Sequence, residues 1–155
     1  MSESTIFTKK LFVDGEEIFP PAPPPSYPVV RGTPVIEFET STDISLTSSV
    51  CDYQIVGDCV HFNIRIAYSS LGTSSGDLAL ELPSEVLGTF REFQHIQFSG
   101  AYDYVVPANF EFGSAIFGTR LIRGEISTAG VNAPIGAGTM KSSSVIYCSG
   151  SVFLE

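Results

Sequence analysis

Residues 51–66 read Cys-Asp-Tyr-Gln-Ile-Val-Gly-Asp-Cys-Val-His-Phe-Asn-Ile-Arg-Ile, two largely apolar segments joined by Gly57-Asp58. A glycine-containing pair between two such segments is typical of the two-residue turn of a β-hairpin. From Val60 to Tyr68, apolar residues at even positions alternate with mostly polar residues at odd positions. Alternation with a period of two places the apolar side chains on one face of a strand. The stretch therefore predicts a hairpin whose second strand buries one face.

Similar short patterns extend across the rest of the chain, separated by clusters of Gly, Ser, Thr and Asn. Further strands are expected at 36–38, 44–46, 78–82, 95–99, 102–106, 114–117, 121–126 and 145–154. Only residues 84–93 have a pattern compatible with a short helix. Eight or nine short strands at this spacing predict the all-β class, as an antiparallel β-sandwich or jelly-roll-like domain over residues 35–155.

Residues 1–34 differ in composition, because they hold seven of the ten prolines. Residues 11–19 predict a small hairpin around Asp14-Gly15, and residues 20–28 predict a polyproline II segment. The sequence predicts an N-terminal arm that either reaches a neighbouring subunit or straps its own domain. Its expected partner-binding residues are Leu11, Phe12, Val13, Ile18, Phe19, Pro24 and Tyr27.

Charge is scarce in this chain and negative in balance. Charged residues make up 16% of the sequence and hydrophobic residues 43%, and the net charge is −9. Binding to nucleic acid or to an anionic membrane surface requires clusters of Lys and Arg, so neither partner is expected. No secretory signal or membrane-spanning run is expected either. A charge-poor, apolar surface instead favours burial against other protein chains.

Metal, cofactor and disulfide chemistry find little support in the sequence. Cys51, Cys59 and Cys148 form no CxxC pair, and His61 and His95 lie far apart. This spacing predicts no metal site, no cofactor and no disulfide framework. A bridge between Cys51 and Cys59 across their hairpin remains open.

Three carboxylates beside aromatic residues, Asp103, Glu111 and Glu125, are the candidates for glycan hydrolysis. Glycosidases use two convergent carboxylates. Alternating strands produce the same neighbours by default, with the aromatic residue facing the core and the acid facing solvent. A non-enzymatic protein is therefore expected, and a small glycan-active enzyme is the competing hypothesis from another class.

Residues 51–66 and the segment Ser75-Gly-Asp-Leu-Ala-Leu-Glu-Leu-Pro83 together resemble a pattern in tailed-phage virion proteins, namely trimeric capsid cement or decoration proteins and tail-fibre head domains. Tyr53 matches the aromatic residue of that pattern, Gly57-Asp58 its turn, residues 60–66 its strand and residues 78–83 its last element. The chain end, residues 147–153, is similar to the closing strand of this group, whereas Asp52 stands where these proteins usually carry glycine.

This resemblance covers about the last 105 residues and implies an antiparallel β-sandwich that forms a homotrimer, with a structural role in the virion. The first function expected is a capsid cement protein on the outer capsid surface, assembled in the host cytoplasm, whose arm clamps the major capsid protein. The alternative is the receptor-binding head of a short tail fibre or tail spike. Its arm would join a baseplate or fibre shaft, and Tyr102 and Tyr104 would contact host cell-surface glycan.

Overall fold

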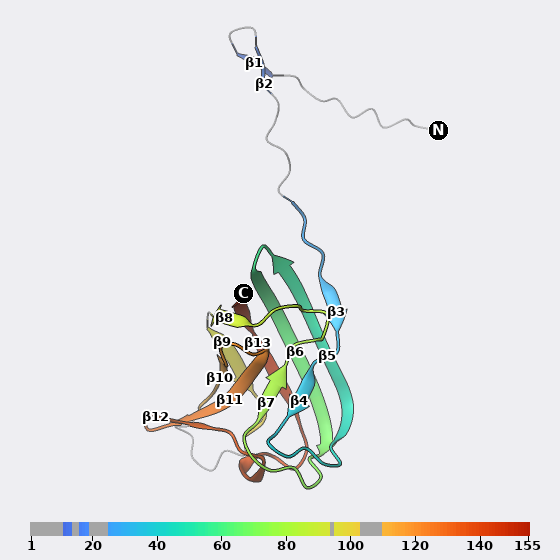
Figure 1. Cartoon of the computed structure of the whole chain (residues 1–155), viewed down its shortest axis with the longest axis vertical. Helices are drawn as coiled ribbons and strands as arrows, with labels where there is room; N and C mark the ends of the chain where they lie inside the picture. The colour runs from blue at the N-terminus through green and yellow to red at the C-terminus, as the bar shows by residue number, and fades with distance from the viewer. Residues whose placement is uncertain (1–10, 14–15, 19–24, 94, 103–109) are drawn as a thin grey trace, which may run out of the picture.

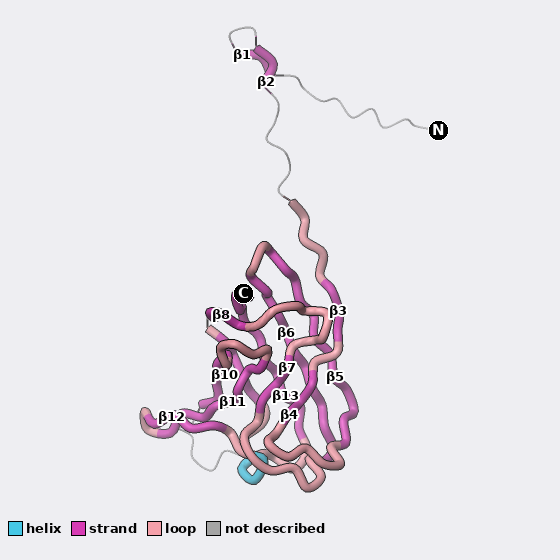
Figure 2. Tube along the Cα trace, in the orientation of Figure 1, coloured by secondary structure: helices cyan, strands magenta, loops and turns pink. Residues whose placement is uncertain are grey.

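The computed structural model describes residues 11–13, 16–18, 25–93, 95–102 and 110–155. Within these residues it contains thirteen β-strands and a single-turn 3₁₀ helix, Ala137–Thr139 (Figures 1 and 2). Every pair of neighbouring strands is antiparallel. The prediction of an all-β, antiparallel fold is confirmed.

Eleven of the described strands belong to one sheet. Its main path is β3 (Val30–Gly32), β5 (Ser45–Val56), β6 (Cys59–Ser70), β13 (Ser144–Leu154), β9 (Ile96–Ser99), β10 (Phe110–Ala115), β11 (Leu121–Thr128), β7 (Ala79–Glu81) and β4 (Val35–Glu37). Two further strands lie off this path: β8 (Phe90–Phe93) pairs with β13, and β12 (Val131–Pro134) pairs with β11. The other sheet consists of β1 (Leu11–Val13) and β2 (Glu16–Ile18).

The hairpin predicted around Gly57-Asp58 is formed by β5 and β6. Val56 pairs with Cys59 across the turn, and Gly57 has a φ of +64°, as a two-residue hairpin turn requires. The expected apolar face is the buried one, since Val60, Phe62, Ile64, Ile66 and Tyr68 are all buried. The alternation read from the sequence therefore corresponds to the core face of the longest hairpin in the described structure.

The large sheet curls into a half-barrel, and the chain connectivity requires this curvature. Strands β3 and β4 end the main path of the sheet at opposite edges, but only residues 33–34 separate them in sequence. Two linking residues span less than about 11 Å even when fully extended, so the two edges must lie close together. On the opposite side, Gly113 of β10 pairs with Gly124 of β11. A Cβ atom at Gly113 would lie 2.4 Å from Ile96 Cγ2, and one at Gly124 would lie 2.9 Å from Phe98 Cζ. Glycine at these two positions therefore permits the close packing.

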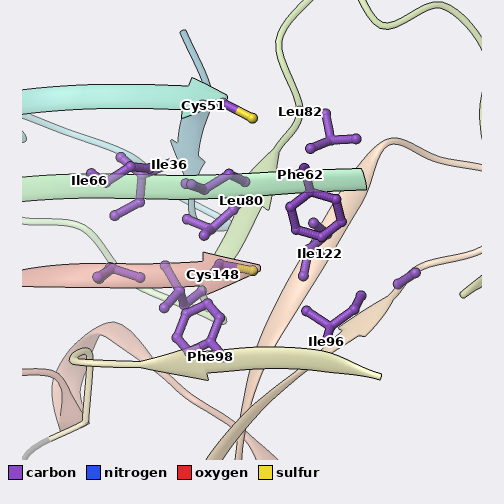
Figure 3. Packing of buried hydrophobic residues seen from close by; sticks show 14 of the residues in the cluster. Ile36, Cys51, Phe62, Ile66, Leu80, Leu82, Ile96, Phe98, Ile122 and Cys148 are labelled. Atoms are coloured by element: carbon purple, nitrogen blue, oxygen red, sulfur yellow. The ribbon is translucent and has the colours of Figure 1, made fainter. Parts of the chain in front are cut away.

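The concave face of the curled sheet encloses a single apolar core (Figure 3). Leu80 and Ile122, from one side of the half-barrel, pack in the same cluster as Cys51 and Cys148. All three cysteines are free thiols, so the bridge between Cys51 and Cys59 is not formed. Burial raises the pKa of the Cys51 thiol to about 12 and also raises that of Cys148. These two thiols therefore serve as small core residues rather than as reactive groups.

Three local predictions differ from the structure. No helix forms in residues 84–93, which contain turns followed by β8. The strand expected at 114–117 lies at Phe110–Ala115, and residues 128–139, where no strand is expected, contain β12 and the 3₁₀ turn. Short polar or mixed segments carry weak periodicity, so tertiary pairing decides their structure.

The N-terminal hairpin is present as β1 and β2, with Leu11 opposite Ile18 and Val13 opposite Glu16. Its expected turn, residues 14–15, lies outside the described residues, as do residues 19–24 of the expected polyproline segment. Val30–Gly32, within the expected arm, pairs with Cys51–Tyr53 of the large sheet. The division between residues 34 and 35 stays a prediction. Among the described residues, no helix is long and apolar enough to cross a membrane.

Candidate interaction surfaces

The residues predicted to bind a partner through the arm fall into three groups. Leu11, Phe12, Val13 and Ile18 belong to the β1–β2 hairpin, whereas Phe19 and Pro24 lie outside the described residues. Tyr27 is 40% exposed, and its carbonyl accepts a hydrogen bond from Gln54 Nε2 on β5. This hydrogen bond ties the chain to the outer face of the sheet just before β3. The partner-binding role of the arm residues stays a prediction.

The residues proposed for glycan contact or hydrolysis do not gather at one place in the described structure. Tyr104 and Asp103 lie outside the described residues, and Tyr102 packs partly buried against the core. Glu125 pairs with Phe112, whereas Glu111 pairs with Ile126. Because successive residues of a strand face opposite sides, these pairs place Glu111 and Glu125 on opposite faces of the sheet. These two carboxylates therefore cannot converge on one substrate.

Glu111 has a different role, because its carboxylate binds the backbone of the turn after β9. Its oxygens accept hydrogen bonds from the N–H groups of Gly100, Ala101 and Tyr102 at 2.7, 2.8 and 2.6 Å. Successive backbone N–H groups of this kind form a concave site for an anion, and here the anion is a side chain of the protein itself. Glu111 thus holds the turn against β10.

A cleft of about 240 Å³ beside β4, β7 and β11 is lined by four charged residues, Glu37, Glu39, Asp77 and Arg123. Glu37 also adjoins an ion pair next to this cleft. Glu37 of β4 and Glu81 of β7 are diagonal neighbours on one face, because Val35 pairs with Glu81 and Glu37 with Ala79. The Arg120 side chain forms an ion pair with Glu81 and donates hydrogen bonds to the backbone carbonyls of Ser84 and Val86. Burial raises the pKa of Glu37, and the charge of Glu81 and a hydrogen bond to it add to the rise.

Replacing Glu37 by Gln is expected to stabilise the protein at neutral pH. A carboxyl whose pKa is raised by folding opposes folding once the pH rises through that pKa, and glutamine removes the ionised form. The gain should be roughly 0.5 kcal/mol, or about 1–2 °C in Tm, and should disappear below the ordinary Glu pKa. Thermal melts at pH 7 and pH 4 measure it, with Glu92→Gln on exposed β8 as the control. A gain at pH 7 that persists at pH 4 would contradict this explanation.

A largely apolar hollow of about 310 Å³ lies on the outer flank, where β8, β9 and β10 meet β12. We call it the aromatic hollow. Its side chains include Phe93, His95, Phe110, Phe112, Ser114 and Asn132. Phe110 and Phe112 have ring centroids 5.9 Å apart, and Phe93 has the same separation from Phe117. Phe110 is 58% exposed and Phe117 59% exposed, so the described part of the chain leaves much of each ring uncovered.

The sequence does not predict the aromatic hollow, because the aromatic residues of β10 are expected to face the core and its acid to face solvent. Phe110 and Phe112 face outward, and Glu111 shares the opposite face with Gly113 and Ala115, the reverse of the expected arrangement. The available signal was the strict alternation itself, which placed the two phenylalanines on one face. It did not show which face lay against the core.

Both histidines are exposed on the outer surface. His61 Nδ1 is 2.6 Å from Ser151 Oγ, and His95 lines the aromatic hollow. Within the part of the chain that the structure describes, no group of three or more His, Cys, Asp or Glu residues is placed to hold a metal ion.

No protein-family model and no curated protein sequence matches the chain. The structure is similar to a solved structure, the crystal structure of Dettilon tailspike protein (gp208), with a TM-score of 0.63 and 23% sequence identity. The match covers 82% of this chain and 24% of the tailspike chain, so this chain corresponds to about a quarter of the tailspike's length. The curled all-β fold described above is therefore one that also occurs within a tailspike protein.

Proposed function

We propose that this chain is a non-enzymatic structural β-domain of a phage tail spike or short tail fibre, assembled as a homotrimer in the virion. The observation that carries the proposal is the fold likeness to a tailspike protein over 82% of the chain. The resemblance of residues 51–66 and 75–83 to tailed-phage virion proteins supports it independently. The opposite orientation of Glu111 and Glu125 supports a role without glycan hydrolysis by that pair.

A position in the tail is favoured over a position on the capsid. Capsid cement was the first function expected from the sequence, but the comparisons lend it no support, because the solved structure that matches is a tail protein. The arm then has a baseplate or fibre shaft as its proposed docking site, in place of the major capsid protein. Because the match covers only 24% of the tailspike chain, receptor binding by this chain is a further proposal.

The position of the chain in the virion tests this proposal directly. Purified virions, labelled with antibodies against the β-domain and examined by electron microscopy, should carry the label on the tail. Quantitative mass spectrometry of the same virions should give tens of copies or fewer, scaled against the major capsid protein. Labelling over the whole capsid at hundreds of copies would instead establish the cement function and overturn the tail proposal.

A further inference from the structure

We propose that the aromatic hollow is an interface between copies of this chain, and that it receives the tip of the β11–β12 hairpin from a second copy. This inference rests on the proposed homotrimer and names the surface that forms it. Asn132 of β12 lines the hollow, so the hairpin adjoins it. Figure 1 shows the β11–β12 hairpin projecting away from the rest of the sheet.

The chemistry of the hollow favours a protein occupant. The residues that line it include no Asp, Glu, Lys or Arg, although the chain carries 17 acidic residues and a net charge of −9. Depletion of charge around aromatic side chains is typical of the buried centre of a protein–protein interface. Its polar side chains, His95, Ser114 and Asn132, are uncharged when the imidazole is neutral and stand beside three phenylalanines, which offer no hydrogen-bonding atom, so most of the lining suits an apolar group. The occupant is therefore expected to be mainly apolar.

The β11–β12 hairpin supplies an apolar projection of matching character. Its tight turn has Ala129 at φ +51° and Gly130 at φ +82°, both in the left-handed region. The next residue, Val131, is 70% exposed, and all four residues of β12 are exposed. Such a strand buries little surface within its own chain, so its apolar tip is available to a neighbour.

Because the hairpin lies beside the hollow, the same contact can repeat from one copy to the next. Asn132 lines the hollow of its own chain, but Val131 does not. Each copy therefore carries a projection and a receiving site next to each other, and Val131 is free to enter a neighbour's hollow. A contact between two different surfaces of the same chain closes into a ring when the rotation between copies allows it. A ring of three matches the proposed homotrimer.

Oligomeric state, measured by light scattering on the full chain, tests the surface. The wild-type protein should be a trimer, whereas Val131→Asp and Phe110→Ser should each give monomers with unchanged far-UV circular dichroism. Both side chains are largely exposed, so neither substitution removes core packing. Leu87→Ser is the matched control, because Leu87 is 79% exposed but does not line the hollow, and this variant should remain trimeric.

Cross-linking then tests the pairing of the two elements. In a background with Cys59→Ser, which removes the only partly exposed native thiol, V131C and S114C are unfolded together, refolded as one mixture and oxidised mildly, so that mixed trimers form and Phe110 is kept. A disulfide-linked dimer should form in the mixture and not in either variant alone. Absence of that dimer from a trimeric protein overturns the inference, as do trimers that persist in Val131→Asp and Phe110→Ser. A monomeric wild type would overturn the proposed homotrimer itself, and host-glycan binding abolished by Phe110→Ser in such a monomer would assign the hollow to a glycan.

Discussion

Replacing Gly100 by alanine is expected to lower the free energy of unfolding by about 4 kcal/mol or more, a large share of the stability of an ordinary domain. Gly100 has a φ of +95°, which L-residues with a Cβ atom rarely adopt. A Cβ atom at this position would lie 2.0 Å from the backbone carbonyl oxygen of Val145. The strained φ costs about 1–2 kcal/mol and the overlap with backbone costs about 1–3 kcal/mol, before any hydrogen bond is disturbed.

The hydrogen bonds of Gly100 increase the expected loss. Its N–H donates to Glu111, and its carbonyl accepts the Ser144 hydroxyl at 2.6 Å, so any shift that relieves the overlap breaks ordered contacts. Gly57→Ala is the matched control, because Gly57 also has a positive φ of +64° but has no atom within 4 Å of the position that a Cβ atom would occupy. Urea unfolding should give a loss of only about 1 kcal/mol there. Equal losses for the two variants would show that the contact with Val145 does not matter.

The parts of the fold that were predictable are those with strong local signals. The β5–β6 hairpin combines a Gly-Asp turn with five alternating apolar residues, and both features act between near neighbours in sequence. The curvature into a half-barrel has no such signal. It depends on β3 and β4, three-residue strands that pair with β5 and β7 far along the chain. Pairing at that distance is decided by the whole core.

The candidate interaction surface was less predictable than the fold, and β10 shows why. Periodicity groups Phe110 with Phe112, and Glu111 with Gly113, but it does not say which group faces inward. Hydrophobicity favours burial of the phenylalanines. In the structure the inner position is too crowded for large side chains, since Ile96 Cγ2 would lie 2.4 Å from a Cβ at Gly113. The acid is accepted on that side because three backbone N–H groups meet its carboxylate.

Replacing Glu111 by Gln should lower the free energy of unfolding by about 3 kcal/mol. Hydrogen bonds to a charged group contribute about 1.5–3 kcal/mol each, and a buried donor left without its acceptor costs about 1–3 kcal/mol. A glutamine side chain offers one oxygen in place of two and directs an amide N–H₂ group toward backbone donors. The turn after β9 would loosen, and it is linked to the rest of the domain. The Ala101 carbonyl accepts a hydrogen bond from the Lys141 N–H at 2.9 Å, and Tyr102 forms an antiparallel β-bridge with Met140.

Glu125→Gln separates this effect from a general change of charge on the same hairpin. Glu125 lies on the opposite face of the β10–β11 pair, so its replacement removes one negative charge without touching the turn. Urea unfolding should show a large loss for Glu111→Gln and a change within about 0.5 kcal/mol for Glu125→Gln. In the double variant with Gly100→Ala, the cost of Glu111→Gln should shrink, because residues that share a hydrogen-bond network are not additive. Full additivity would mean that the Glu111 carboxylate does not hold the turn at Gly100.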